Sequence, residues 1–362
     1  MRRRSRRAFA AAAALLGLLV LTLALPVRSW RTGEPSAPPL ATSPGRPIAP
    51  PPLRVWVDTD AACGRSPRTD PDDCLAILLL AASPDMRVAG VSTVFGNAPL
   101  TVTDSTTRAL AAALDSGDMA VPPVSRGAAE PLDPPTGTAA SAALTAALEE
   151  APLVIVALGP LTNIAHVLAA RPDLVARVQR VVAVMGRRRG HLFHPVEGGQ
   201  AHSFLGHGPV FRDFNFAQDP DAVARVLATG IPMTLVPYEA AREIVVTEAT
   251  LNGMMRRGGA ARWVAARSRA WLGYWRDDIG TEGFYPFDLL GAAYVVGPQH
   301  FRCAETFAQI GRDPGLLGWL GRRGLFVGRG ERAVLYCGDI AATLPGWLGS
   351  AGIAAAGASA AE

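Results

Sequence analysis

Two groups of aspartates, close together in the sequence, are the side chains best placed for chemistry. Asp58 and Asp60 follow the apolar run LRVWV and lie two apart on an extended segment, so their side chains point to the same side. Asp70, Asp72 and Asp73 open the helix expected next. Carboxylates that share a small volume raise one another's pKa, and a divalent cation removes that repulsion. With oxygen donors and no neighbouring Cys/His set, the pattern favours Ca²⁺ or Mg²⁺ over zinc.

Other interpretations of these acids stay open. Asp70 can serve only as the cap of the helix, and Asp72 can be solvated on its first turn. An Asp-x-Asp motif after an apolar strand also opens phosphatases of the haloacid-dehalogenase type, in which the first acid, here Asp58, is the nucleophile. Those enzymes usually use a lysine to neutralise the phosphoryl-enzyme. The chain of 362 residues contains no lysine, which disfavours the phosphatase interpretation.

The elements that must position these acids alternate between strand and helix. We expect strands at 53–58, 87–96, 151–159, 180–186 and 232–238, and helices at 71–80, 103–114, 161–170 and 220–227. Thr69 or Asp70 is the expected cap of the first helix, with Pro71 in its first turn. This alternation predicts an α/β fold with an open, mostly parallel sheet and helices on both faces. Such sheets bind ligands beyond the carboxyl ends of their strands, where these acids lie.

The charge of the chain is concentrated at its N-terminus. Residues 1–53 hold eight arginines and one acid, whereas the remainder holds 27 arginines and 30 acids and is mildly acidic. The formal net charge of +4 therefore does not indicate a polyanion, and we expect no nucleic-acid partner. The four cysteines show no CxxC or Cys/His spacing, which excludes a disulfide scaffold or zinc knuckle as the organising principle. The oxidation state of Cys303 and Cys337 stays open.

The N-terminal segment indicates export. Residues 1–27 combine an arginine-rich head with a nearly uncharged run over 8–27, which is long enough for a cleaved signal peptide or for a retained membrane anchor. Its Ser-Arg-Arg-Ala-Phe motif also resembles a twin-arginine signal. We expect a periplasmic or extracellular protein, with a Pro-rich linker over 28–53, one domain over 54–348 and a low-complexity tail over 349–362.

Six motifs together resemble one known family, in that family's order. They are VWVDTD with TDPDDCLAILLL, VSTVFGNAPL, VIVALGPLTNIA, VVAVMG, FRDFNFAQDPDA and FYPFDLLGAAYVVGP, and they run from about Leu53 to about Pro298. The chain resembles the inosine-uridine-preferring nucleoside hydrolases. The resemblance implies a single Rossmann-like domain with one Ca²⁺-containing active site at the strand ends. It also implies a small-molecule nucleoside substrate, hydrolysis to ribose and free base, and a homo-oligomer.

The resemblance assigns roles residue by residue. The metal ligands would be Asp60, Asp73, the backbone carbonyl of Leu158, and Asp288, with Asp60 also the general base toward metal-activated water. Asp72, Asn97 and Asn215 would hold the ribose hydroxyls. Asp213 stands where the family usually has a glutamate, and His207 where another asparagine is usual.

Several features depart from the family pattern and indicate an altered substrate. Phe287 precedes Asp288 where a histidine that protonates the leaving base is common, and residues 61–69, AACGRSPRT, lengthen the first strand–helix turn. Three sets of residues are candidate replacements or substrate contacts, each with a plainer alternative as loop or core. They are the histidines His191, His194, His202 and His207, the aromatic residues Trp263, Trp271, Tyr274 and Trp275, and the arginines Arg187, Arg188 and Arg189. Alternatively, the chain is a catalytically weak nucleoside-binding or sensing protein of the same fold.

Overall fold

The computed structural model describes residues 40–116, 119, 121–131, 137–189, 213–312 and 322–340. The strands are β1 (Ser43–Pro44), β2 (Leu53–Thr59), β3 (Met86–Thr93), β4 (Val124–Arg126), β5 (Leu153–Ala157), β6 (Val178–Ala183), β7 (Arg187–Arg188), β8 (Met233–Leu235), β9 (Val246–Thr247), β10 (Gly283–Phe284), β11 (Phe301–Arg312), β12 (Arg323–Val327) and β13 (Arg332–Ile340). The α-helices are α2 (Asp72–Ala82), α3 (Leu100–Asp115), α4 (Ala139–Glu150), α5 (Thr162–Ala170), α6 (Phe214–Gln218), α7 (Pro220–Ala228), α8 (Tyr238–Ala241), α9 (Glu248–Arg257), α10 (Gly259–Tyr274) and α11 (Phe287–Val296). Short 3₁₀ turns cover Pro172–Arg177 and Pro298–His300, and a π-helical turn, Trp275–Ile279, follows α10.

The central sheet runs in the order β4-β3-β2-β5-β6-β8-β13-β11-β12-β7. From β4 to β13 all neighbours are parallel, as the alternation of strands and helices predicted. After β2 the chain moves outward to β3 and β4, and then returns to the other side of β2 with β5. The direction of winding therefore reverses between β2 and β5. Ligand crevices of open α/β sheets lie at this kind of reversal, beyond the carboxyl ends of the strands.

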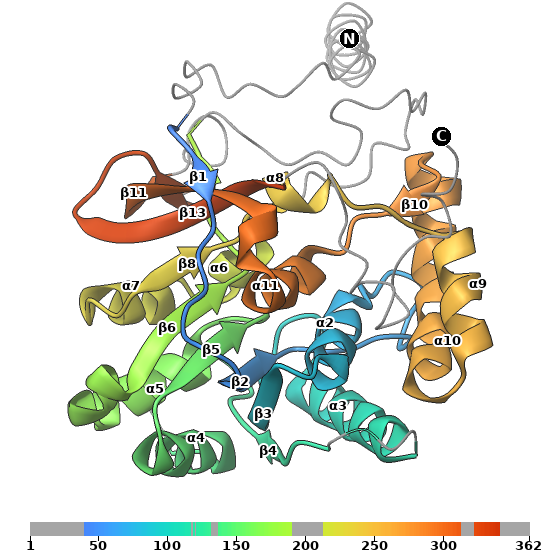
Figure 1. The fold of residues 1–362 in the computed structure, drawn as a ribbon, viewed down its shortest axis with the longest axis horizontal. Helices are drawn as coiled ribbons and strands as arrows, with labels where there is room; N and C mark the ends of the chain where they lie inside the picture. Colours follow the sequence, from blue (N-terminus) through green and yellow to red (C-terminus); the bar gives the residue numbers. More distant parts are fainter. Residues whose placement is uncertain are drawn as a thin grey trace, which may run out of the picture.

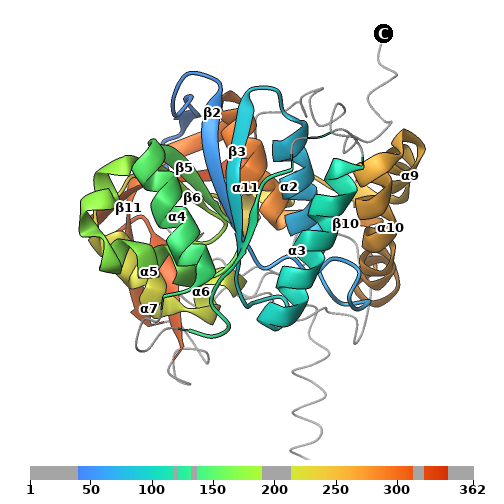
Figure 2. The same ribbon diagram turned by 90° about the horizontal axis from the view of Figure 1, so that it is seen from below.

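Helices cover both faces of this sheet, and each face has its own hydrophobic core. Figure 2 shows α4, α5 and α7 on one face and α2, α3 and α11 on the other, with α9 and α10 packed outside α2 and α3. β5 consists of LVIVA with all five residues buried, which is typical of a parallel strand that is covered on both sides. The fold is thus the predicted single α/β domain with an open, mostly parallel sheet.

The structure departs from the sequence prediction at the start of α2. Pro71, not Thr69 or Asp70, occupies the N-cap position, and it provides no side-chain cap. The carboxylate of Asp70 instead accepts a hydrogen bond from the backbone N–H of Asp72, at 3.2 Å. Proline lacks a backbone N–H, and at the start of a helix this loses no intrahelical hydrogen bond, so Pro71 is compatible with a helix that begins at Asp72.

The carboxyl-terminal part of the sheet was not predicted. β11 pairs antiparallel with β12, β13 and β1, and β13 then joins the parallel strands through β8. β1 lies within the Pro-rich segment 28–53, where the backbone N–H of Gly45 also donates to the carbonyl oxygen of Phe301 at 2.9 Å. Figure 1 shows β1, in blue, against β11 and β13 at the opposite end of the chain. The described part of this segment is therefore bound to the domain.

All four cysteines are paired. Cys63 and Cys74 form one disulfide, and Cys303 and Cys337 form a second that joins β11 to β13. The sequence had left the state of the second pair open and had not suggested the first. Within the described ranges no helix is long and apolar enough to cross a membrane. Residues 1–27 and 349–362 lie outside those ranges.

Candidate active site

Three buried carboxylates from distant parts of the sequence meet at the reversal point of the sheet. Asp60 follows β2, Asp73 lies in the first turn of α2, and Asp288 lies in the first turn of α11. One oxygen of each side chain lies within 4.8 Å of the other two. Figure 1 shows α2 and α11 side by side next to the carboxyl end of β2. The backbone N–H of Asp288 donates to the carboxylate of Asp72 at 2.8 Å, which ties the first turns of the two helices together.

Asn97 connects two of these carboxylates. Its backbone N–H donates to Asp60 at 2.8 Å, and its side-chain amide donates to Asp60 at 3.2 Å and to Asp73 at 3.1 Å. Gly96 has a φ of 154°, and a Cβ at this position would lie 1.8 Å from a carboxylate oxygen of Asp60. Only glycine therefore lets the loop after β3 approach Asp60 closely enough for these bonds. Thr59 adds a hydroxyl hydrogen bond to Asp73, a contact that the sequence analysis missed.

Burial and mutual repulsion perturb the acidity of all three groups. Burial, followed by the charge of Asp73, raises the pKa of Asp60 well above its usual value. Burial and the charge of Asp72 raise the pKa of Asp73 to about 7. Burial and the neighbouring aspartates raise the pKa of Asp288 in the same direction. Buried carboxylates that face one another at this spacing fit a divalent cation, because the cation compensates the charge that the protein interior does not.

Asp58 does not belong to this trio, although its spacing in the sequence predicts a place beside Asp60. It is fully buried in β2, where Asn163 donates to it at 2.8 Å and the Ser92 hydroxyl also donates. Burial raises the pKa of Asp58 to about 7. Asn163 also donates to the carbonyl of Thr93 at 3.0 Å, so Asp58 takes part in a bond network that joins β2, β3 and α5. Asn163 belongs to the TNIA motif of the sequence, but the motif alone did not show that Asn163 contacts Asp58.

The other site candidates lie along the same edge of the sheet. The side-chain amide of Asn215 donates to the carbonyl of Leu158 at 2.6 Å and to that of Val184 at 3.2 Å, bridging the residues after β5 and β6. Asp213 caps α6 and accepts from the backbone N–H of Gly186 at 2.7 Å. Asp72 is buried beside Asp73. His207, like His191, His194 and His202, lies outside the residues that the structure describes.

The aromatic residues before Asp288 are buried or half-buried. Trp271 and Trp275 are buried, in agreement with the core interpretation. Trp275 packs edge-on against Tyr285 at a ring-centroid distance of 5.0 Å and lies 6.5 Å from Phe287. Phe287, which stands where a histidine was expected, is therefore part of an aromatic cluster directly beside Asp288. Tyr274 is half-buried.

The arginine run after β6 is engaged inside the protein. Arg187 is buried, and its guanidinium lies over the ring of Phe326, 4.8 Å from the centroid. Arg188 pairs with the buried carboxylate of Glu239 at 3.0 Å. These contacts give Arg187 and Arg188 partners inside the protein at β7, which the interpretation as a solvated loop did not predict.

Comparison with solved structures agrees with the observed fold. A structure titled plant nucleoside hydrolase, the PpNRh1 enzyme, aligns with a TM-score of 0.64 at 20% identity, over 80% of this chain and 95% of that one. The purine-preferring ribonucleoside hydrolase from Gardnerella vaginalis also aligns with a TM-score of 0.64, at 18% identity, over 83% of this chain and 97% of that one. At such identities the likeness concerns the fold.

Comparison of sequences identifies the family. A non-specific ribonucleoside hydrolase, RihC, of Escherichia coli O1:K1 is 27% identical over 288 residues, which cover 71% of this chain and 84% of RihC. An uncharacterised protein of Schizosaccharomyces pombe is 28% identical over 308 residues, covering 76% of this chain and 83% of that protein. The family model described as inosine-uridine preferring nucleoside hydrolase matches residues 55–316, a range that contains all three clustered carboxylates. The chain therefore belongs to the inosine-uridine preferring nucleoside hydrolase family.

Proposed function

We propose that this protein hydrolyses the N-glycosidic bond of ribonucleosides to ribose and free base, with Ca²⁺ held by Asp60, Asp73, Asp288 and the carbonyl of Leu158. The observation that carries the proposal is the buried trio of carboxylates, whose oxygens lie within 4.8 Å of one another at the reversal point of the sheet. Ca²⁺ prefers oxygen ligands and accepts about six to eight of them, so three carboxylates and a backbone carbonyl would hold it and would not fill its ligand set. When bound there, a divalent cation would lower the pKa of water and so make a nucleophile available at neutral pH.

Asp60 is the proposed general base. It is one of the three clustered carboxylates, and its two oxygens accept hydrogen bonds from the backbone and side-chain N–H groups of Asn97. A carboxylate held in a fixed direction beside the cation would be placed to accept a proton from the attacking water. Because Asn97 also donates to Asp73, it fixes the direction of both carboxylates.

The remaining site residues are proposed to hold the sugar. Asp72, Asn97, Asn215, Asp213 and His207 are assigned to the ribose hydroxyls or the base. Cleavage of an N-glycosidic bond develops positive charge on the ribose ring, so buried carboxylates around the ring stabilise the transition state more than the ground state. With Phe287 in place of a histidine, the aromatic cluster beside Asp288 offers the base an apolar wall in place of a proton donor. We therefore propose a substrate preference that differs from that of relatives with a histidine there.

Export and self-association are further proposals. The arginine-rich and apolar residues 1–27 support export to the periplasm or the cell exterior, with the apolar segment as signal peptide or anchor. The two disulfides agree with this proposal, since disulfides persist in oxidising compartments. We also propose a homo-oligomer, which light scattering on the purified protein will test.

A panel of nucleosides tests the proposed function. Purified protein is incubated with inosine, uridine, adenosine, guanosine and cytidine, and the released base and reducing sugar are both measured, with Ca²⁺ and with a chelator. We expect release of base and sugar in equal amounts from at least one nucleoside, and its loss with the chelator. No release from any nucleoside at high protein concentration, together with a nucleoside-induced rise in the melting temperature, would favour a binding protein instead.

A further inference from the structure

The loop that separates the first two proposed ligands contains a cysteine, and the helix that follows contains its partner. Residues 61–71 run from Asp60 to α2, and they include the AACGRSPRT segment that lengthens this turn. Cys63, in the loop, forms a disulfide with Cys74, in α2, across a sequence separation of 11. Both cysteines are buried.

The disulfide joins the two segments that carry Asp60 and Asp73. Cys63 follows shortly after Asp60, and Cys74 is the residue directly after Asp73. The two carboxylates are buried and lie within 4.8 Å of each other, so without a cation their charges repel each other in a medium that screens poorly. A covalent bond between the segments opposes their separation. Asn97 opposes it as well, through its hydrogen bonds to both carboxylates.

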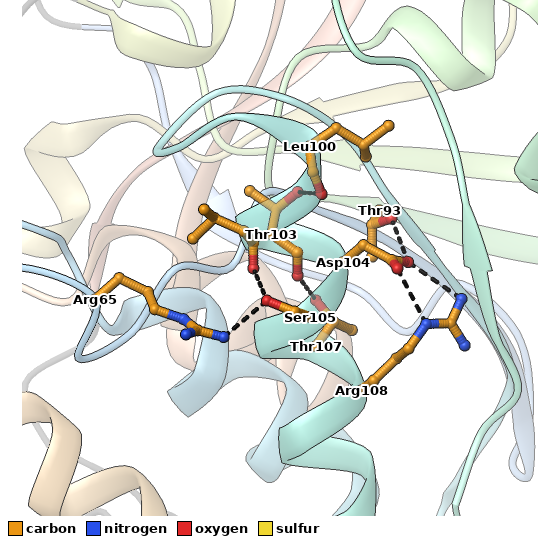
Figure 3. A network of polar contacts seen from close by, with 9 residues as sticks. Arg65, Thr93, Leu100, Thr103, Asp104, Ser105, Thr107 and Arg108 are labelled. Atoms are coloured by element: carbon orange, nitrogen blue, oxygen red, sulfur yellow. Dashed lines mark hydrogen bonds and ion pairs between the residues drawn. The ribbon is translucent and has the colours of Figure 1, made fainter.

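The same loop is fixed to the neighbouring helices. Arg65 donates to Ser105 at 2.7 Å and to Thr106 at 2.8 Å, both on α3, and Figure 3 shows its guanidinium reaching Ser105. Arg68 lies over the ring of Tyr274 on α10, 5.2 Å from the centroid. The loop is thus held by contacts with α3 and α10 as well as by the disulfide. Asp60 directly precedes this loop and Asp73 lies just after it, so the position of the loop bears on the spacing of the two carboxylates.

We propose that the Cys63–Cys74 disulfide is a positioning element of the cation site. It holds the Asp60 and Asp73 carboxylates close enough to bind one cation before the cation arrives. The free-energy cost of bringing the two charges together is then met during oxidative folding, and it does not reduce the affinity for the cation. The inference rests on the proposed function, because it takes both carboxylates as cation ligands. Coupling of this kind is reciprocal: the disulfide strengthens cation binding, and the bound cation makes the disulfide harder to reduce by the same factor.

The second disulfide provides a matched control. Cys303 and Cys337 are also buried, and they join β11 to β13, two strands that carry none of the proposed ligands. Its removal is expected to lower the stability of the protein, as removal of a native disulfide usually does, and to leave the cation site unchanged. A general loss of stability can thus be separated from a specific effect on the site.

The first experiment compares two double variants with the wild type by calorimetric titration of Ca²⁺ at one pH, after circular dichroism has shown that each is folded. We expect the Kd for Ca²⁺ of Cys63→Ala/Cys74→Ala to be raised by about tenfold or more, as is usual when a group that orients metal ligands is lost. The Kd of Cys303→Ala/Cys337→Ala should equal that of the wild type. Equal Kd values in both variants and the wild type would overturn the inference alone. No Ca²⁺ binding by the wild type would overturn the proposed cation site and the inference with it.

A second experiment uses only the wild-type protein and covers the case in which a variant does not fold. In glutathione buffers, one disulfide and two glutathione thiols exchange to give two protein thiols and one glutathione disulfide. Trapped thiols are read by mass spectrometry separately for each cysteine pair, with and without Ca²⁺. A tenfold coupling shifts the Cys63–Cys74 midpoint by about 30 mV toward more reducing potentials. An unshifted Cys63–Cys74 midpoint, or an equal shift of both pairs, contradicts the inference.

Discussion

Asp60, Asp73 and Asp288 bring three buried carboxylates from distant parts of the sequence to one point of the fold. The acids after β2 and at the start of α2 indicated an all-oxygen cation site from their spacing alone, because the carboxyl end of a strand and the start of the next helix must be close. Asp288 was found only through resemblance, since nothing near it in the sequence marks it as a partner of Asp60. Thr59 and Asn163 were missed because their hydrogen bonds join segments whose contacts depend on the assembled sheet.

Loss of the Asp73 carboxylate should weaken cation binding and should raise the thermal stability of the cation-free protein. Loss of a residue that only hydrogen-bonds to a metal ligand costs roughly 10- to 100-fold in metal affinity. Asp73 is itself a proposed ligand, so we expect Asp73→Asn to weaken Ca²⁺ binding by more than that. Without Ca²⁺, at pH 8, the same variant should melt at a higher temperature than the wild type, because one buried charge is gone. Asp104→Asn is the control, since Asp104 is buried and pairs with Arg108 outside the site. Parallel behaviour of the two variants would contradict the assignment.

The raised pKa values predict how the cation-free protein responds to pH. The pKa of Asp73 is about 7 in the folded protein, against an ordinary value of 3.8, and the pKa values of Asp60 and Asp288 are raised as well. Between pH 4 and pH 7, roughly, these carboxyl groups bind more protons in the folded state than in the unfolded state. The free energy of unfolding therefore falls as the pH rises over this range.

Urea unfolding in a chelator at several pH values measures this effect. Saturating Ca²⁺ should remove most of the fall, and Asp73→Asn should show a shallower dependence than the wild type in the chelator. A wild-type protein whose cation-free stability stays constant or rises over this range would argue against a cluster of buried, mutually repelling carboxyl groups.

At the scale of elements, the alternation of strands and helices predicted the parallel half of the sheet. β2, β3, β5, β6 and β8, with α2, α3, α5 and α7, appeared near their expected positions because apolar runs and turn residues mark them locally. The short edge strand β4 and the alanine-rich helix α4, which lie between β3 and β5, were not predicted. The antiparallel strands β11, β12 and β13 were not predicted either. β11 is 12 residues long with a mixed burial pattern, and its pairing depends on β1 and β13, which are far away in the sequence.

Close packing of α11 against the sheet is required to position Asp288. A Cβ on Gly291 would lie 2.7 Å from the side chain of Val184, which follows β6. Gly291→Val should therefore cost about 1–3 kcal/mol in the free energy of unfolding through overpacking, and should weaken Ca²⁺ binding because α11 shifts. Gly253→Ala, in α9, is the control, because the Cβ has free space and should stabilise the helix slightly. Calorimetry and urea unfolding measure both effects, and unchanged Ca²⁺ affinity in a destabilised Gly291→Val protein would refute the positional argument.

At the scale of the whole molecule, charge and oxidation state together bear on where the protein works. The excess of arginine lies in residues 1–53, and the structure pairs all four cysteines. Deletion of residues 1–27 should retain the protein inside the cell, where reducing conditions keep both pairs as thiols. Cell fractionation followed by thiol trapping measures both properties at once. Full-length protein that stays in the cytoplasm would contradict the export proposal and leave the site assignment intact.

The most direct test of the central claim is the release of free base by the purified protein under control of the cation. Chelator-treated protein should release no base from the nucleoside that it prefers, and addition of Ca²⁺ should restore release of base and ribose in equal amounts. Asp60→Asn, reloaded in the same way, should be slower by about 10²- to 10⁴-fold, the usual contribution of a general base. Base release that is unaffected by the chelator, or by loss of the Asp60 carboxylate, would contradict this account of the site.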